Sequence, residues 1–253
     1  MNIIRTAIVF LYLVPVFFIS LVQLFIGWVY TRIDPKKSEL WQLGIVQHYL
    51  RTIYRLAGIK PKFVGLENIP KNGEAVLYVS NHRSIFDVIL TYTVQPGPVG
   101  YISKIGFANV PLLSWWMKRV SCLFLDNHDV KDGLKMVLKA IDMVKGGTSM
   151  TIYPEGTRFT GSDEMTPAEF HEGSFKIATK ANARVIPIAS YHTSPLFEEH
   201  KPIIHAGHPV IRFGEPVDIS TLSDEDKKHP GKYFRGVILD MLQEIKNEEE
   251  KKQ

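Results

Sequence analysis

The sequence contains very little cysteine, with Cys122 alone among 253 residues. A single cysteine excludes an intramolecular disulfide, and its apolar setting, Val-Ser-Cys-Leu-Phe-Leu, indicates a buried thiol more than a nucleophile or a metal ligand. The nine histidines are scattered without the spacing of a ligand cluster, so neither a metal site nor a bound cofactor is predicted. This composition agrees with a reducing, cytoplasmic setting.

Two further absences narrow the class of function. No cluster of Lys and Arg and no aromatic-basic motif occurs, so nucleic acid is not an expected partner. No Gly-x-Ser-x-Gly nucleophile elbow occurs either, which disfavours a lipase or another hydrolase that uses water. The net charge of +4 and the pI near 9.0 favour anionic partners instead, such as lipid head groups or phosphorylated substrates.

Charge is also missing from a long stretch near the N-terminus, between Ala7 and Tyr30. About 24 residues of helix measure roughly 36 Å, which exceeds a hydrocarbon core of about 30 Å. The run is too long for the apolar core of a secretory signal, and it ends in Ile-Gly-Trp-Val-Tyr, an aromatic end suited to the membrane interface. We therefore expect a retained membrane element.

A basic amphipathic helix is predicted next, capped by Ser38 and ended by Gly58. Its apolar positions recur at three- and four-residue steps: Leu43, Val46, Leu50, Ile53 and Ala57. Two interpretations stay open. Residues 1–58 form a two-helix anchor that lies partly in one leaflet, or a spanning helix is followed by an ordinary core helix.

The remaining residues, 59–253, are predicted to form one α/β catalytic domain with a mixed, largely parallel sheet flanked by helices. The expected strands are Ala75–Ser80, Val99–Ser103, Cys122–Leu125, Thr148–Tyr153, Val185–Ser190 and Val210–Phe213. The expected helices are Ile85–Val94, Leu112–Val120, Val130–Lys145 and Gly173–Ala181. In such sheets the loops that leave the carboxyl ends of the strands form the ligand crevice.

The first of these loops, Asn-His-Arg-Ser-Ile-Phe-Asp at 81–87, has two interpretations. Ser84 and Asp87 are spaced as a capping box, which makes His82 a plain loop residue. Alternatively, His82 is a general base near neutral pH that Asp87 orients. The two are compatible if His82 folds back toward the first helical turn while Ser84 caps, with Asp87 turned to the imidazole instead of completing the box.

The second loop, Tyr-Pro-Glu-Gly-Thr-Arg at 153–158, follows another apolar strand. Gly156 permits close backbone approach, Thr157 offers a hydroxyl, and Arg158 offers a planar cationic fork that suits phosphate or carboxylate. The alternative is a structural turn in which Arg158 pairs with Glu155.

Together the motifs resemble the ordered set of the glycerolipid acyltransferases, and most of all the 1-acylglycerol-3-phosphate (lysophosphatidic acid) acyltransferases. The resemblance covers roughly residues 60 to 220. It rests on Asn81-His82 with Asp87, Lys104, Pro111 with Trp115-Trp116, the block at 153–158, and Val185-Ile186-Pro187-Ile188. Two departures from the family pattern are Asp126-Asn127, where many members have Asp-Arg, and His171, which replaces a basic residue common before the glycine of the Phe-Lys-x-Gly stretch.

The resemblance implies the chemistry and its residues. His82 is then the catalytic base and Asp87 its partner, and the residues expected at the substrate are Asn81, Arg83, Lys104, Glu155, Gly156, Thr157 and Arg158. Backbone N–H groups at the helix start or in the Gly156 loop are candidate donors to the oxyanion. The implied substrates are lysophosphatidic acid and an acyl thioester of coenzyme A or acyl carrier protein.

The implied product is phosphatidic acid, made by a membrane-anchored enzyme whose catalytic domain lies on the cytoplasmic side. Two alternatives are an acyltransferase for another lysolipid acceptor and a non-catalytic protein that binds anionic lipids peripherally.

Overall fold

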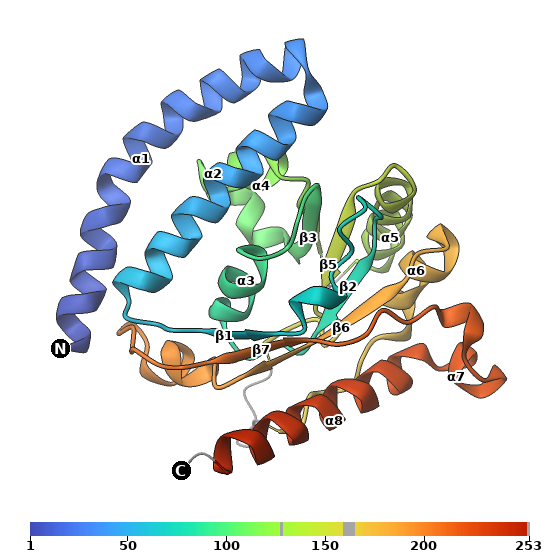
Figure 1. The fold of residues 1–253 in the computed structure, drawn as a ribbon. Coiled ribbons are helices and arrows are strands. Elements are labelled where there is room, and N and C mark those ends of the chain that lie inside the picture. The colour runs from blue at the N-terminus through green and yellow to red at the C-terminus, as the bar shows by residue number, and fades with distance from the viewer. Residues whose placement is uncertain (127–128, 159–164, 252–253) are drawn as a thin grey trace.

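Short apolar runs of the chain pair into one sheet (Figure 1). The computed structural model describes residues 1–126, 129–158 and 165–251. Within these ranges the strands are β1 (Lys62–Val64), β2 (Leu77–Ser80), β3 (Val99–Lys104), β4 (Leu123–Leu125), β5 (Ser149–Ile152), β6 (Val185–Tyr191) and β7 (Val210–Phe213). Their order is β1-β7-β6-β2-β5-β3-β4. All pairings are parallel except that of β6 with β7, so the predicted mixed, largely parallel sheet is confirmed.

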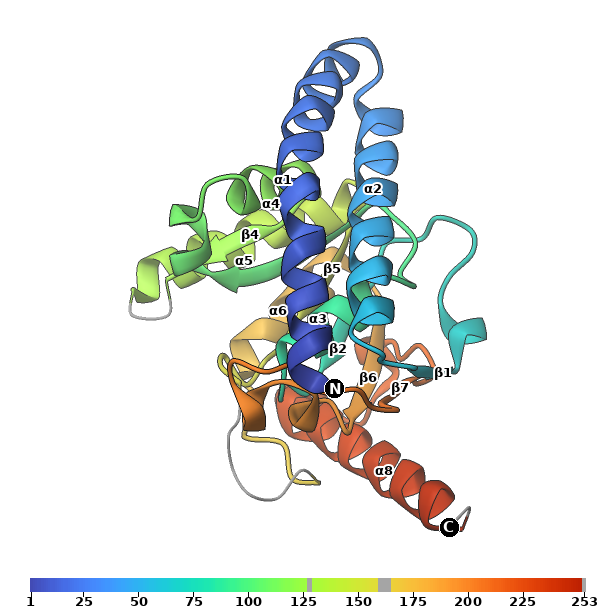
Figure 2. The same cartoon turned by 90° about the vertical axis from the view of Figure 1, so that its left-hand side faces the viewer.

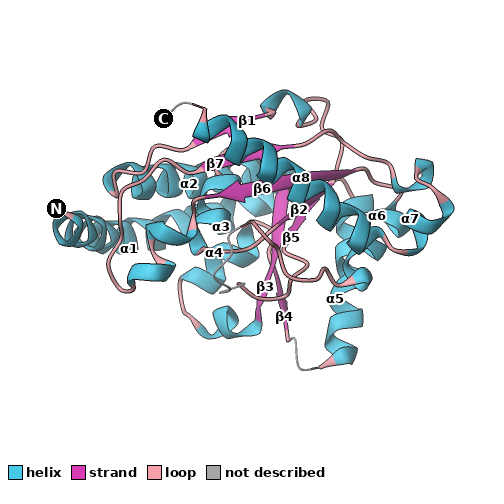
Figure 3. Cartoon of the chain, turned by 90° about the horizontal axis from the view of Figure 1, so that it is seen from below, coloured by secondary structure: helices cyan, strands magenta, loops and turns pink. Residues whose placement is uncertain are grey.

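Helices cover both faces of the sheet (Figures 1 and 3). They are α1 (Asn2–Ile33), α2 (Pro35–Leu56), α3 (Ile85–Tyr92), α4 (Leu113–Arg119), α5 (Val130–Lys145), α6 (Lys176–Ala181), α7 (Asp224–Lys228) and α8 (Pro230–Glu250). Because side chains alternate along a strand, Leu77 and Val79 of β2 pack toward α5, α6 and α8, whereas Tyr78 packs toward α2 and α3. The central strand β2 is therefore buried on both faces.

The six expected strands all occur, with ends shifted by at most two residues. Strand β1 is an addition, since three residues are too few for a periodic pattern. The expected helix at 173–181 is split into a 3₁₀ turn, Glu172–Phe175, and the short α6. Cys122 is buried, as its apolar setting predicted, and this burial raises the pKa of its thiol to about 11.

Helices α1 and α2 form an antiparallel pair whose closed end projects beyond the sheet (Figure 2). Asp34 caps α2, because its Oδ1 accepts a hydrogen bond from Lys37 N–H at 3.0 Å, and Pro35 takes the first helical position. The expectation that Ser38 is the cap is wrong, since Asp34-Pro35 starts the helix one turn earlier. The Ser38 hydroxyl instead donates to the carbonyl of Gly27 across the pair at 3.1 Å.

Helix α1 is long and apolar enough to cross a membrane by length and composition, and it is the one such helix among the described residues. Most of its side chains are exposed. Near one end, the N–H of Ile204 donates to Thr6 Oγ1 at 2.9 Å, and near the other, Arg119 Nη1 donates to Thr31 Oγ1 at 3.5 Å. Both ends of α1 therefore contact the same α/β domain, and the helix runs alongside that domain (Figure 1).

Candidate active site

The polar loops meet because their strands are neighbours. Strand β2 pairs with β5, with Val79 opposite Ile152, so the loops that leave these two strands begin side by side. Strand β3 lies on the other side of β5 and ends at Lys104. Strand β6 flanks β2, and the chain after it returns to the same edge. Four connections thus converge where parallel strands present their carboxyl ends.

His82 and Asp87 are in direct contact at this edge. His82 Nδ1 lies 3.0 Å from Asp87 Oδ2, and the Asp87 side chain is completely buried. Because an ionised carboxylate only accepts hydrogen bonds, Nδ1 is the donor and Nε2 is the ring nitrogen that can take a proton. The imidazole also stacks on the Tyr153 ring, with centroids 4.2 Å apart, which fixes its plane. The His82 side chain is 16% exposed, so a substrate has limited access to it.

The same carboxylate oxygen also completes the capping box of α3. Asp87 Oδ2 accepts from the backbone N–H groups of Arg83 at 2.6 Å and Ser84 at 2.7 Å, while Ser84 Oγ accepts from Phe86 N–H at 3.1 Å. The expectation that Asp87 leaves the box in order to reach the imidazole is wrong. An ionised carboxylate oxygen has room for several donors, and His82 folds back far enough to be one of them.

Glu155 holds the backbone of the same loop from the β5 side. Its Oε1 accepts from His82 N–H at 2.6 Å and its Oε2 from Ala168 N–H at 2.9 Å. Both Glu155 oxygens are therefore occupied inside the protein, where they hold the backbone of His82 and Ala168. Burial raises the pKa of this carboxyl above its usual range. Because protonation removes an acceptor, the contact weakens at a higher pH than it would at an exposed glutamate.

Glu198, in the connection after β6, was not predicted from the sequence. Its Oε1 accepts from Ile85 N–H at 3.1 Å and from Arg158 Nη1 at 2.8 Å, and its Oε2 accepts the Ser84 hydroxyl proton. The internal partner of Arg158 is therefore Glu198 and not Glu155. Glu198 belongs to no recognisable motif, and the one indirect signal is that it follows a strand paired with β2.

A second cationic group faces the loop from β3. Lys104 Nζ donates to Thr157 Oγ1 at 2.9 Å, and both residues are exposed. Gly156 between the two loop contacts has φ +71°, and a Cβ there would lie 3.2 Å from His171 Nε2, so the turn needs glycine. Lys104, at the end of β3, and Arg158, in the loop after β5, thus lie near each other beside His82.

Two other predicted residues are turned inward. The Asn81 amide pairs with both backbone groups of Ser190 on β6, at 2.9 and 2.8 Å, and so joins β6 to the end of β2. Arg83 is 5% exposed, which leaves little of it for a ligand to contact. Asn127, one of the departures from the family pattern, lies outside the described residues. Within the described ranges, no group of three His, Cys, Asp or Glu side chains could hold a metal ion.

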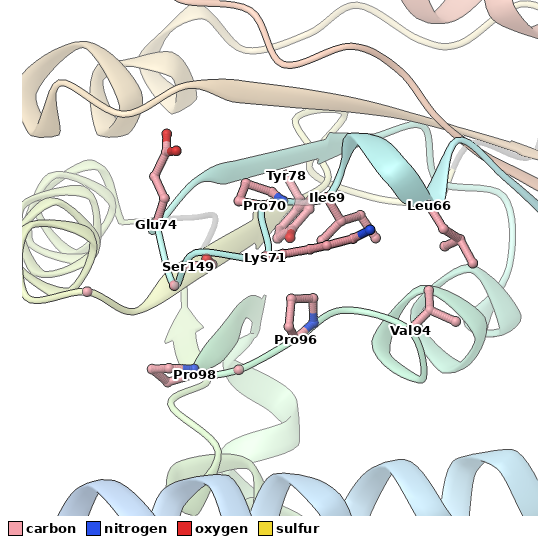
Figure 4. A pocket seen from close by; sticks show the side chains of 13 residues that line it. Leu66, Ile69, Pro70, Lys71, Glu74, Tyr78, Val94, Pro96, Pro98 and Ser149 are labelled. Carbon is pink, nitrogen blue, oxygen red and sulfur yellow. The ribbon is translucent and has the colours of Figure 1, made fainter.

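A cavity of about 480 Å³ lies elsewhere, at the amino ends of the strands (Figure 4). Its lining includes Pro98, which precedes β3, Ser149 at the start of β5, and Tyr78 of β2. Its lining is largely apolar and includes none of the predicted site residues. It is therefore separate from the loops that hold His82 and Asp87.

Comparison with known proteins gives consistent matches. The model of the Acyltransferase family matches residues 60–191. The 1-acyl-sn-glycerol-3-phosphate acyltransferase of Borreliella burgdorferi is 28% identical over 192 residues, which cover 76% of this chain and 75% of that protein. The enzyme of the same name from Saccharomyces cerevisiae is 24% identical over 210 residues, 83% of this chain and 68% of that one.

A solved structure has the same fold. The crystal structure of the 1-acyl-sn-glycerophosphate acyltransferase PlsC from Thermotoga maritima superposes with a TM-score of 0.79 and covers 97% of both chains at 23% identity. The match extends over the N-terminal helix pair as well as the sheet, since so little of either chain is left out.

The Glu155 contacts predict a rate effect without a binding effect. Glu155→Gln replaces one acceptor oxygen by an amide donor that opposes a backbone N–H, so the His82 loop shifts and kcat falls about 100-fold. The KM for the acceptor should change little, and the melting temperature should fall modestly because a partly buried N–H loses its acceptor. Steady-state kinetics on Glu155→Gln and on Glu169→Gln, an exposed control in the same connection, measure this. A raised KM at unchanged kcat would show instead that Glu155 contacts the acceptor.

Proposed function

The chain belongs to the Acyltransferase family, and we propose that it transfers a fatty acyl chain from a thioester to the free hydroxyl of lysophosphatidic acid, giving phosphatidic acid. The observation that carries this proposal is the buried Asp87 carboxylate at 3.0 Å from the His82 imidazole, at the sheet edge where two cationic side chains converge. The choice of acceptor is supported by relatives that are named for this reaction and that match this chain over most of their length.

His82 acts as the general base. A glycerol hydroxyl is a poor nucleophile near pH 7, so Nε2 removes its proton as the oxygen attacks the thioester carbonyl, a contribution of roughly 10²- to 10⁴-fold. Asp87 holds the Nδ1–H tautomer and stabilises the imidazolium that forms. The tetrahedral intermediate collapses with cleavage of the C–S bond, and the imidazolium returns its proton to the departing thiolate. No covalent enzyme intermediate is required.

The oxyanion of the intermediate needs N–H donors, and the start of α3 is an unsuitable source. Its backbone donors are already used: those of Arg83 and Ser84 by Asp87, that of Ile85 by Glu198, and that of Phe86 by Ser84. The Thr157 N–H, in contrast, has no hydrogen-bond acceptor in the described part of the chain. The Gly156 N–H is used by the Tyr153 carbonyl, so we assign the oxyanion contact to the Thr157 N–H.

The acceptor phosphate is bound by Arg158 and Lys104. A phosphate monoester carries between one and two negative charges near neutral pH, and the planar Arg158 fork can hold two of its oxygens while Lys104 adds a point charge. Arg158 is about 38% exposed in its ion pair with Glu198, so it can keep that partner through Nη1 and offer its other N–H groups to a ligand.

The division into an anchor, residues 1–58, and a catalytic domain, residues 59–253, is part of the same proposal. Because Thr6 and Thr31 near opposite ends of α1 both contact the α/β domain, a helix that crosses the bilayer would place part of this domain on each side. The contacts therefore support an α1–α2 pair that lies in one leaflet. We place the catalytic domain on the cytoplasmic side, where acyl thioesters of coenzyme A or acyl carrier protein are available.

Removing the base should abolish the reaction without unfolding the protein. His82→Ala is expected to lose acyl transfer, measured as thiol release that depends on added lysophosphatidic acid, with a near-native melting temperature. His229→Ala, at an exposed histidine, is the control. Ser84→Ala should cost about 1 kcal/mol of stability and keep much of the activity. An active His82→Ala enzyme would refute the mechanism, and thiol release without acceptor would indicate a thioesterase.

Replacing Arg158 separates phosphate recognition from structure. Arg158→Lys keeps the charge but loses the fork, so activity should fall more with lysophosphatidic acid than with an acceptor lacking a phosphate monoester. The ratio of the two activities and the melting temperature are measured together. An unchanged ratio with a lowered melting temperature would mean that Arg158 serves only its ion pair with Glu198.

The one-leaflet anchor predicts the same sidedness for both ends of α1. Cysteines introduced as Asn2→Cys, Lys36→Cys and, as a marker of the catalytic side, Lys251→Cys should all react with an impermeant maleimide added to the outside of sealed vesicles. The native Cys122 is buried and gives little background. If one end of α1 is protected until the vesicles are opened while Lys251→Cys is labelled, the helix spans the bilayer.

A further inference from the structure

An apolar surface lies in the catalytic domain, far along the chain from the N-terminal helices. It is formed by the 3₁₀ helix Ile105–Asn109, labelled η2 here, and by the start of α4. Five large apolar side chains of this segment are between 36% and 50% exposed: Ile105, Phe107, Val110, Leu113 and Trp115. We call residues 105–115 the η2–α4 surface. So many exposed apolar side chains within eleven residues usually mark a contact with another molecule.

The η2–α4 surface lies between the candidate active site and the N-terminal pair. Its first residue follows Lys104, whose Nζ contacts the Thr157 hydroxyl in the site. At its other end, α4 continues to Arg119, which reaches Thr31 at the end of α1, and α4 also packs against α2. Figures 1 and 2 both show α4 beside the helix pair. The segment that carries the apolar surface therefore ends against both helices of the N-terminal pair.

Its charge selects the kind of partner. Acidic residues are absent from the sequence between Val88 and Leu125, whereas Lys104, Lys118 and Arg119 lie within this stretch. An apolar segment whose charged neighbours along the sequence are all cations, and whose Trp115 is half-exposed, has the composition of elements that enter the interface of an anionic bilayer. Tryptophan is enriched at that depth because its ring is apolar and its N–H is polar.

We propose that the η2–α4 surface is a second membrane contact, which enters the head-group region of the leaflet that holds α1. It seats the mouth of the site on the bilayer, so that a lysolipid reaches His82 without leaving the lipid phase. The role in substrate delivery depends on the proposed function. The membrane contact itself depends only on the exposed side chains and their charge.

Depth measurements test the contact without reference to catalysis. A nitroxide attached to Phe107→Cys in the full chain, bound to vesicles of phosphatidylcholine and phosphatidylglycerol, should gain collisions with oxygen and lose collisions with a water-soluble nickel chelate. The control is Leu134→Cys, at an exposed leucine of α5 on the opposite face of the sheet. Its collision profile should be the same with and without vesicles. A Phe107 label that stays as accessible to nickel as the Leu134 label overturns the proposal.

Activity on two acceptors tests delivery. The double variant Phe107→Ser with Trp115→Ser should lose about tenfold or more in rate on lysophosphatidic acid embedded in vesicles, because two exposed apolar groups that enter the membrane are removed from the contact. On a short-chain acceptor dissolved in water it should keep the rate of the unmodified enzyme. Leu134→Ser with Leu138→Ser is the matched control. Equal losses on both acceptors would overturn delivery and indicate damage to the site.

The two proposals fail in different ways. If the unmodified enzyme acylates neither acceptor, the proposed function is wrong, and the nitroxide depths still decide whether the η2–α4 surface enters the membrane. If the enzyme is active and the depths of the two labels agree, the membrane contact alone is wrong.

Discussion

One oxygen atom, Oδ2 of Asp87, holds the candidate active site together. It accepts the imidazole N–H of His82 and the backbone N–H groups of Arg83 and Ser84. Burying an unpaired carboxylate costs several kcal/mol, and three donors from a helix start are the kind of compensation that makes it tolerable. The same contacts determine where α3 begins and which way the base points. The cap and the proposed catalytic pair are therefore one structure.

Two more carboxylates extend this arrangement. Glu155 binds the backbone N–H of His82 from β5, and Glu198 binds the first turn of α3 and Arg158 from the connection after β6. Each reaches the loop after β2 from a connection that follows a strand paired with β2. A site proposed for an anionic acceptor is thus built on three acids, and Arg158 and Lys104 must offset their charge before they can attract phosphate.

The sequence was informative wherever the physics is local. The spacing of Ser84 and Asp87 predicted the cap, apolar runs predicted the strands, and parallel topology predicted that the loops after β2 and β5 would meet. Glu198 was missed because its importance comes from a fold-back over more than a hundred residues, which leaves no periodic signal. Glu155 was assigned toward the ligand because a motif identifies a residue without giving its direction. Ser38 was misplaced as a cap because Asp34 and Pro35 compete for the same role one turn earlier.

The one-leaflet position proposed for α1, alongside the catalytic domain, has a kinetic consequence. An enzyme held in the plane of a leaflet meets its lipid substrate by lateral diffusion in two dimensions. The variable that governs saturation is then the mole fraction of lysolipid in that leaflet and not its molarity in the suspension. Inert phospholipid added at constant total lysolipid dilutes the surface and slows turnover, while the water-soluble thioester keeps an ordinary three-dimensional concentration dependence. The two substrates of one reaction would thus saturate the enzyme on different concentration scales, one a surface mole fraction and the other a bulk molarity.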